Sequence, residues 1–153
     1  MRIAIISDIH ANFVALQTVL ADIERARADQ IVCLGDVVCN GPQPRQVLRR
    51  LREIGCQMVM GNADEILFQP PNFDPADARE RKIVEIISWS LGQLSADENE
   101  IVRGFPLTLE IALESGKTML CFHGSPQANT HLILATTSDD ELAAKLGDYR
   151  ATV

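Results

Sequence analysis

The chain has 153 residues, with 14 lysines and arginines against 21 aspartates and glutamates, which gives a formal charge of −7. This length suits one domain with a hydrophobic core of its own, and 46% hydrophobic residues exclude a disordered chain. The acidic balance excludes a protein that binds nucleic acid non-specifically by neutralising its phosphates.

The first half of the chain alternates short apolar runs with amphipathic segments. The runs lack polar alternation, which is typical of buried parallel strands, and they cover residues 2–7, 30–34 and 56–60. Apolar residues at helical spacing predict a helix over residues 12–27 with Asn12 as its N-cap, and a second helix that begins at Pro44. This order predicts right-handed crossovers and a mainly parallel sheet.

The second half has a different pattern. A turn-rich loop at 69–75 precedes a predicted helix that ends near Leu94, and Ser95–Glu98 forms a capping box for a short helix. Strict alternation over 107–113, a turn, and a run at 117–122 predict an antiparallel hairpin. Further predicted elements are a helix from Ser138 to Leu146 and the beginning of a strand at 151–153. The fold class is therefore α/β, with a mainly parallel sheet, flanking helices and an antiparallel hairpin of a second sheet.

Polar side chains able to bind a metal follow each apolar strand. They are Asp8 and His10, Asp36, Asn62 and His123. In an open α/β sheet, ligands bind beyond the carboxyl ends of the strands, so we expect these five residues to converge on one rim. Asp8 and His10 are two positions apart, and in an extended segment they would share one face.

The residue types indicate the chemistry. Two carboxylates, two imidazoles and one carboxamide, with no thiolate, suit Mn²⁺, Fe or Zn²⁺. A carboxylate between two ions about 3.5–4 Å apart would let both ions stabilise a phosphoryl displacement, and coordination lowers the pKa of a bound water to about 7. The pattern predicts metal-assisted hydrolysis of a phosphate ester.

Four segments in order carry a family resemblance: Ser7–Asn12, Gly35–Val38, Gly61–Asp64 and Phe122–Ser125. They resemble the motifs of the calcineurin-like metallophosphoesterases, in particular the small bacterial and archaeal phosphodiesterases. The resemblance implies a four-layer α/β/β/α fold and a binuclear centre of two divalent ions (Mn, Fe, Zn or Ni). It also implies that Asp36 bridges the ions, with Asp8 and His10 on the first and Asn62 and His123 on the second.

The chain departs from the family pattern at two places. Many relatives have a histidine after the Gly-Asn pair, where this chain has Ala63, and relatives continue into a Gly-His-x-His motif that the 153 residues do not contain. We therefore expect residues 1–153 to be a single phosphoesterase domain that lacks its C-terminal part. An unfinished sheet would leave a strand edge through which two copies could associate.

The predicted function is hydrolysis of phosphate esters, more specifically of phosphodiesters, by a metal-bound hydroxide, with Asp36, Asn62 and His123 as catalytic residues. The partner would be a small phosphorylated substrate. One alternative is a weakly active or inactive protein-binding module on the same fold. Another takes Asp8 and Asp36 as the acidic cluster of a receiver-like domain, which would have no use for the histidines.

The cysteines, the third histidine and the apolar runs indicate no further functional site. Cys33, Cys39, Cys56 and Cys121 form no Cys-x-x-Cys pair, so we expect packed thiols rather than a zinc site or disulfides. His131 is expected to be solvated. The first apolar run is too short for a signal peptide, and no run reaches the roughly 18 apolar residues of a membrane helix, which predicts a cytoplasmic protein without membrane contact.

Overall fold

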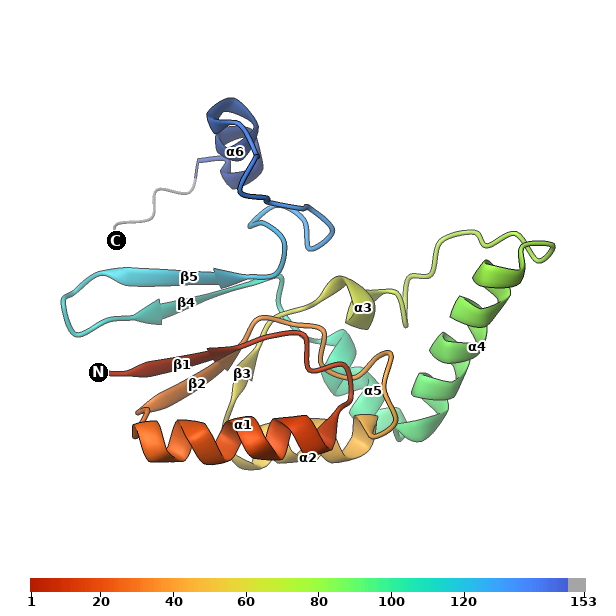
Figure 1. Ribbon diagram of the computed structural model, residues 1–153, viewed down its shortest axis with the longest axis horizontal. Helices are drawn as coiled ribbons and strands as arrows, with labels where there is room; N and C mark the ends of the chain where they lie inside the picture. The colour runs from red at the N-terminus through yellow and green to blue at the C-terminus, as the bar shows by residue number, and fades with distance from the viewer. Residues whose placement is uncertain (149–153) are drawn as a thin grey trace.

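The computed structural model of the protein describes residues 1–148 and has a three-stranded parallel sheet at its centre. The strands lie in the order β1 (Ile3–Ile6), β2 (Gln30–Cys33) and β3 (Gln57–Met58). Helices α1 (Phe13–Ala26) and α2 (Pro44–Glu53) connect the strands and cover one face of the sheet (Figure 1). The predicted parallel unit is confirmed.

The other face of the sheet is covered by the antiparallel hairpin of β4 (Thr108–Ala112) and β5 (Thr118–Phe122) (Figure 1). A small cluster of buried side chains lies between the two sheets: Val32, Ile111 and Cys121. The helix layer, the parallel sheet and the hairpin confirm the predicted α/β class. The other helices are α3 (Asn62–Glu65), α4 (Ala78–Gln93), α5 (Ala96–Arg103) and α6 (Asp139–Leu146).

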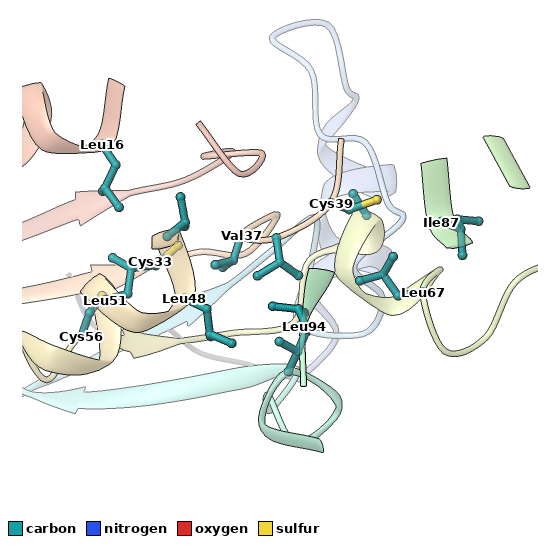
Figure 2. Close-up of a cluster of buried hydrophobic side chains, with 14 residues drawn as sticks. Leu16, Cys33, Val37, Cys39, Leu48, Leu51, Cys56, Leu67, Ile87 and Leu94 are labelled. Carbon is teal, nitrogen blue, oxygen red and sulfur yellow. The ribbon is translucent and has the colours of Figure 1, made fainter. Parts of the chain in front are cut away.

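The first two helices begin where the sequence predicts. The side chain of Asn12 accepts a hydrogen bond from the backbone of Ala15 at 3.0 Å, and Pro44 occupies the first turn of α2. The apolar side chains of α2 are fully buried in the main core: Val47, Leu48 and Leu51. Figure 2 shows this core, which extends from Leu16 to Ile87. Within residues 1–148, no helix has the length and apolar character needed to cross a bilayer.

Two elements differ from the prediction. The third strand is Gln57–Met58 rather than 56–60, because the backbone N–H of Met60 donates to the carbonyl of Pro106 (2.8 Å) instead of continuing the ladder with β2. The short helix α3 was not predicted, since Gly61 and Asn62 indicate a turn. The predicted strand at 151–153 lies outside the described residues.

The capping box of α5 also joins this helix to α2. Glu98 accepts from the backbone N–H of Ser95 at 2.8 Å, and its two oxygens pair with the Nε atoms of Arg45 (3.1 Å) and Arg49 (2.8 Å). The pKa of Glu98 is lowered from 4.5 to about 2. The hydrogen bond from the Ser95 N–H is the largest cause, and the two arginines add to it. Because the folded-state pKa is depressed, this stabilisation is present above pH 4.5 and is lost as the pH falls toward 2.

We expect Glu98→Gln to lower the free energy of unfolding by about 1–2 kcal/mol at pH 7, since both arginine partners are half exposed and solvent weakens the pairing. Urea unfolding at pH 7 and at pH 2.5 measures the effect, and the difference from wild type should shrink at the lower pH. The control is Glu100→Gln, because the one ion pair of Glu100 within residues 1–148 is with exposed Arg103 on the same helix. Equal losses in the two variants would show that Glu98 does not link α2 and α5.

Candidate metal centre

The loops after β1 and β2 lie side by side and are joined through their backbones. The N–H groups of Asp8, His10 and Ala11 donate to the carbonyls of residues 35, 36 and 37 at 2.8–3.1 Å. Asp8 (φ 55°), His10 (φ 45°) and Asp36 (φ 55°) have left-handed backbone conformations, which typically cost about 1–2 kcal/mol per residue. The predicted extended segment from Asp8 to His10 is therefore wrong, and the hydrogen bonds between the loops hold this unfavourable backbone in place.

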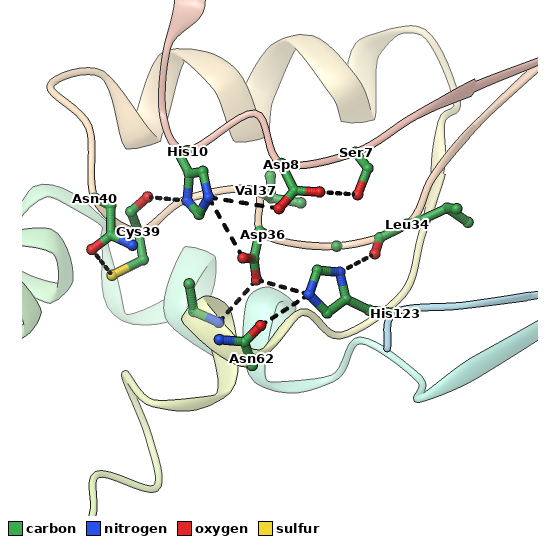
Figure 3. A network of polar contacts seen from close by, with 12 residues as sticks. Ser7, Asp8, His10, Leu34, Asp36, Val37, Cys39, Asn40, Asn62 and His123 are labelled. Atoms are coloured by element: carbon green, nitrogen blue, oxygen red, sulfur yellow. Dashed lines mark hydrogen bonds and ion pairs between the residues drawn. The ribbon is translucent and has the colours of Figure 1, made fainter. Parts of the chain in front are cut away.

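Asp8, His10 and Asp36 nevertheless meet, and each offers a ligand atom within 4.8 Å of the others (Figure 3). Nε2 of His10 lies 3.8 Å from Oδ1 of Asp8 and 3.6 Å from Oδ2 of Asp36. Asp8 is exposed, His10 is half-buried and Asp36 is buried, so the cluster opens to solvent on one side. Ser7 donates to the second oxygen of Asp8 at 2.5 Å. The three residues form a candidate metal-binding group.

The other two predicted ligands, Asn62 and His123, lie on the other side of Asp36. Nε2 of His123 is 2.9 Å from Oδ1 of Asn62 and 3.8 Å from Oδ1 of Asp36. Asp36 thus directs Oδ2 toward His10 and Oδ1 toward His123, as Figure 3 shows. The structure brings all five predicted residues into one network, and their roles as ligands remain predictions.

The hydrogen bonds of the two histidines test whether this arrangement fits a cation. Nδ1 of His123 lies 2.7 Å from the carbonyl of Leu34, and Nδ1 of His10 lies 3.3 Å from the carbonyl of Cys39. A carbonyl cannot donate, so each Nδ1 is the donor, and in a neutral ring Nε2 then presents a lone pair. These lone pairs face carboxylate and carboxamide oxygens, an arrangement of acceptors that a positive ion would satisfy. The donor set therefore fits divalent metals.

Two glycines, Gly35 after β2 and Gly61 after β3, allow the backbones at these strand ends to lie close together. A Cβ on Gly61 would lie 2.1 Å from Oδ1 of Asp36, and a Cβ on Gly35 would lie 2.6 Å from the backbone nitrogen of Gly61. The N–H of Ala63 donates to the same Asp36 oxygen at 2.9 Å. Ala63 thus contributes its backbone, at the first turn of α3, to orienting the central carboxylate.

Asp64 has a supporting role that sequence reasoning missed. Its side chain is fully buried, and its oxygens accept from the N–H groups of Val37 (3.0 Å) and Val38 (2.9 Å), the two residues after Asp36. Burial raises the pKa of Asp64 to about 6, against the effect of these hydrogen bonds. Only the position of Asp64 two residues after the Gly-Asn pair could have indicated this, because the sequence does not show which backbone groups a carboxylate will meet.

A cavity of about 460 Å³ adjoins the Asn62 side of the cluster, and His131 is among the residues that line it. His131 is half-buried, and its Nδ1 lies 2.8 Å from Oγ of Ser125. The expectation that His131 is solvated holds in part, since the residue lines the cavity but the loop after β5 folds back and brings Nδ1 against Ser125. The four cysteines are all buried, and desolvation raises the pKa of each thiol.

Known proteins share both the sequence pattern and the fold. An uncharacterized protein of Methanocaldococcus jannaschii is 30% identical over 125 residues, which cover 82% of this chain and 50% of that protein. A metallophosphoesterase from Sphaerobacter thermophilus has a crystal structure with a TM-score of 0.63 and 34% identity, over 84% of this chain and 49% of that one.

A third similar protein, described as a candidate diadenosine tetraphosphatase, supports the fold alone. The TM-score is 0.61 at 22% identity, and the match covers 81% of this chain and 50% of the other. The chain therefore spans about half the length of the relatives that it matches. The sequence profile of the calcineurin-like phosphoesterases matches residues 1–145. On this match and on the shared fold, the chain belongs to the calcineurin-like phosphoesterase family.

Proposed function

We propose that the protein hydrolyses phosphate esters at a centre of two divalent ions and prefers phosphodiesters. The observation that carries the proposal is the position of Asp36, whose two oxygens are directed toward two separate groups of ligand atoms. Asp8 and His10 would hold one ion, and Asn62 and His123 the other. When bound, such ions lower the pKa of a water molecule and neutralise charge on the phosphoryl group.

The residues of the chain would orient both the ions and the substrate. The carbonyls of Leu34 and Cys39 fix the rings of His123 and His10 with Nε2 toward the centre, and Ala63 fixes Asp36 through its N–H. Hydrogen-bonding partners of this kind raise the affinity of a metal site because the ligands need not reorganise. The shared rim and the cavity that adjoins Asn62 and His123 support a small substrate.

Two features favour a diester over a monoester. The side chain at position 63 is a methyl group, so this position cannot protonate a poor leaving group. The chain also carries a net charge of −7, and a diester brings one negative charge to the centre whereas a monoester dianion brings two.

We expect the protein with added Mn²⁺ to hydrolyse bis(p-nitrophenyl) phosphate with a kcat/KM about tenfold or more above that for p-nitrophenyl phosphate, which has the same leaving group. A tenfold ratio corresponds to about 1.4 kcal/mol of transition-state stabilisation. Chelation should abolish the turnover of both substrates, and fresh Mn²⁺ should restore it. A preference for the monoester would refute the diester assignment. Bound metal without any turnover would instead indicate the protein-binding module.

A further inference from the structure

The loop after β5 returns to the metal centre through a tight turn. Gly124 has φ +71°, and a Cβ at this position would lie 2.7 Å from the carbonyl oxygens of Ala128 and Asn129. The N–H groups of Ser125 (3.0 Å) and His131 (3.2 Å) both donate to the carbonyl of Ala128. Eight residues after His123, the chain therefore places a second imidazole at the cavity that Asn62 and His123 line.

Ser125 determines which nitrogen of His131 carries the proton. Its buried Oγ accepts from the N–H groups of Gln127 and Ala128, both at 3.1 Å, so its lone pairs are used. Its hydroxyl hydrogen can go to Nδ1 of His131 at 2.8 Å or to the carbonyl of Ala128 at 3.4 Å, and the shorter contact is the better bond. Nδ1 is then the acceptor, and the proton of the neutral ring is on Nε2.

The proton of His131 is therefore on the opposite nitrogen from those of His10 and His123. The Nε2 lone pairs of His10 and His123 can coordinate a metal, whereas Nε2 of His131 offers an N–H. Within residues 1–148, no protein atom accepts a hydrogen bond from this nitrogen. A ring with this proton can donate to an anion and cannot, through the same atom, bind a cation.

We propose that His131 Nε2–H donates a hydrogen bond to a phosphoryl oxygen of the substrate in the cavity beside Asn62 and His123. The proposal rests on the proposed function, since it concerns the substrate of the same centre. No proton is transferred in this interaction. A fixed neutral donor stabilises the transition state because its hydrogen bond strengthens as negative charge grows on the oxygen. His131 would thus supply a donor that Ala63 lacks.

The protonation of the rings can be measured without turnover. The chain has three histidines, and long-range ¹H–¹⁵N NMR spectra of the metal-free protein at pH 8.5, where an ordinary imidazole is neutral, distinguish the two tautomers. We expect two rings protonated at Nδ1 and one, His131, at Nε2. In Ser125→Ala, His131 should become a mixture of tautomers. A wild-type His131 protonated at Nδ1 would overturn the proposal.

Binding is tested with inorganic phosphate and the zinc-loaded protein. The Nε2 resonance of His131 should shift on titration with phosphate, and His131→Ala should bind phosphate more weakly while it keeps the zinc content of wild type. An unchanged resonance, or a loss of zinc in His131→Ala, would contradict the assignment. This result does not depend on catalysis, so it remains decisive even if the protein hydrolyses none of the substrates.

In the diester assay, His131→Ala should lower kcat/KM by about 10- to 100-fold, the range expected for one hydrogen bond to a charged group. His131→Gln should recover most of the loss, because its amide still donates, whereas a role in proton transfer would leave the Gln variant as slow as Ala. The control is Leu134→Ala, since Leu134 is 60% exposed in the same loop and does not line the cavity. Equal rates for wild type and His131→Ala would refute the proposal.

Discussion

Asp36→Asn should remove most of the bound metal and most of the hydrolytic activity together. Asp36 is buried between the two groups of ligand atoms, and the substitution removes the negative charge that both ions would share. Residues that only support metal ligands commonly contribute 10- to 100-fold to metal affinity, so we expect a loss above about 100-fold for a central ligand. Metal analysis and diester turnover on the same preparation measure both effects.

Two further variants test the two proposed metal ions one at a time. Asp8→Asn should weaken the binding of the ion beside His10 and leave the binding of the other ion unchanged. His123→Asn should do the reverse, so each variant should keep about one ion per chain. Circular dichroism checks that all variants are folded. A folded Asp36→Asn protein with the metal content and rate of wild type would show that Asp36 does not bridge ions. Loss of a single ion in Asp36→Asn would assign Asp36 to one ion only.

Asp64→Ala should cause a large loss of stability, because Asp64 is fully buried and holds the backbone after Asp36. The variant leaves the buried N–H groups of Val37 and Val38 without their acceptor, and each unsatisfied buried donor costs about 1–3 kcal/mol. We therefore expect the free energy of unfolding to fall by about 2–5 kcal/mol, with a 10- to 100-fold loss of metal affinity because the Asp36 loop is no longer held. Urea unfolding of the metal-free protein and metal titration measure the two quantities.

Asp64→Asn is the matched variant, since its amide oxygen can still accept from both backbone groups. It should retain more stability and more metal affinity than Asp64→Ala. If the two variants lose equal stability, the negative charge of Asp64 matters more than its hydrogen bonds. If Asp64→Ala is as stable as wild type, the carboxylate does not hold the loop.

Regular elements were predictable from the sequence where one local pattern determines them. The cap at Asn12 is an example, because a helix start depends on a few neighbouring residues whose side chains meet their own backbone. The hairpin is another, since its alternation directs Ile111 inward against the parallel sheet. In both cases tertiary packing agrees with the local preference, which is the condition under which such predictions succeed.

The candidate site was predictable in its members but not in its geometry. Strand order alone brings Asp8 and Asp36 to the same rim, whereas His123 follows a strand of the second sheet and reaches them through the packing of the two sheets. The left-handed backbone at Asp8 and His10 depends instead on hydrogen bonds with a second loop. The contact of His131 with Ser125 likewise depends on a turn that closes after Gly124. The local sequence does not show that the second loop will bond to Asp8 and His10, or that Ser125 will bond to His131. Both contacts appeared only in the structure.

The hairpin β4–β5 is attached to the parallel sheet through few buried side chains, of which Val32, Ile111 and Cys121 are the central ones. At its end, His123 joins a network whose other members belong to the first 62 residues. An ion held by both His123 and Asn62 would therefore cross-link the two sheets. Metal occupancy and docking of the hairpin would then be thermodynamically linked. Opening of the hairpin would provide a route for metal release, and we expect rising metal concentration to slow amide hydrogen exchange in β4 and β5.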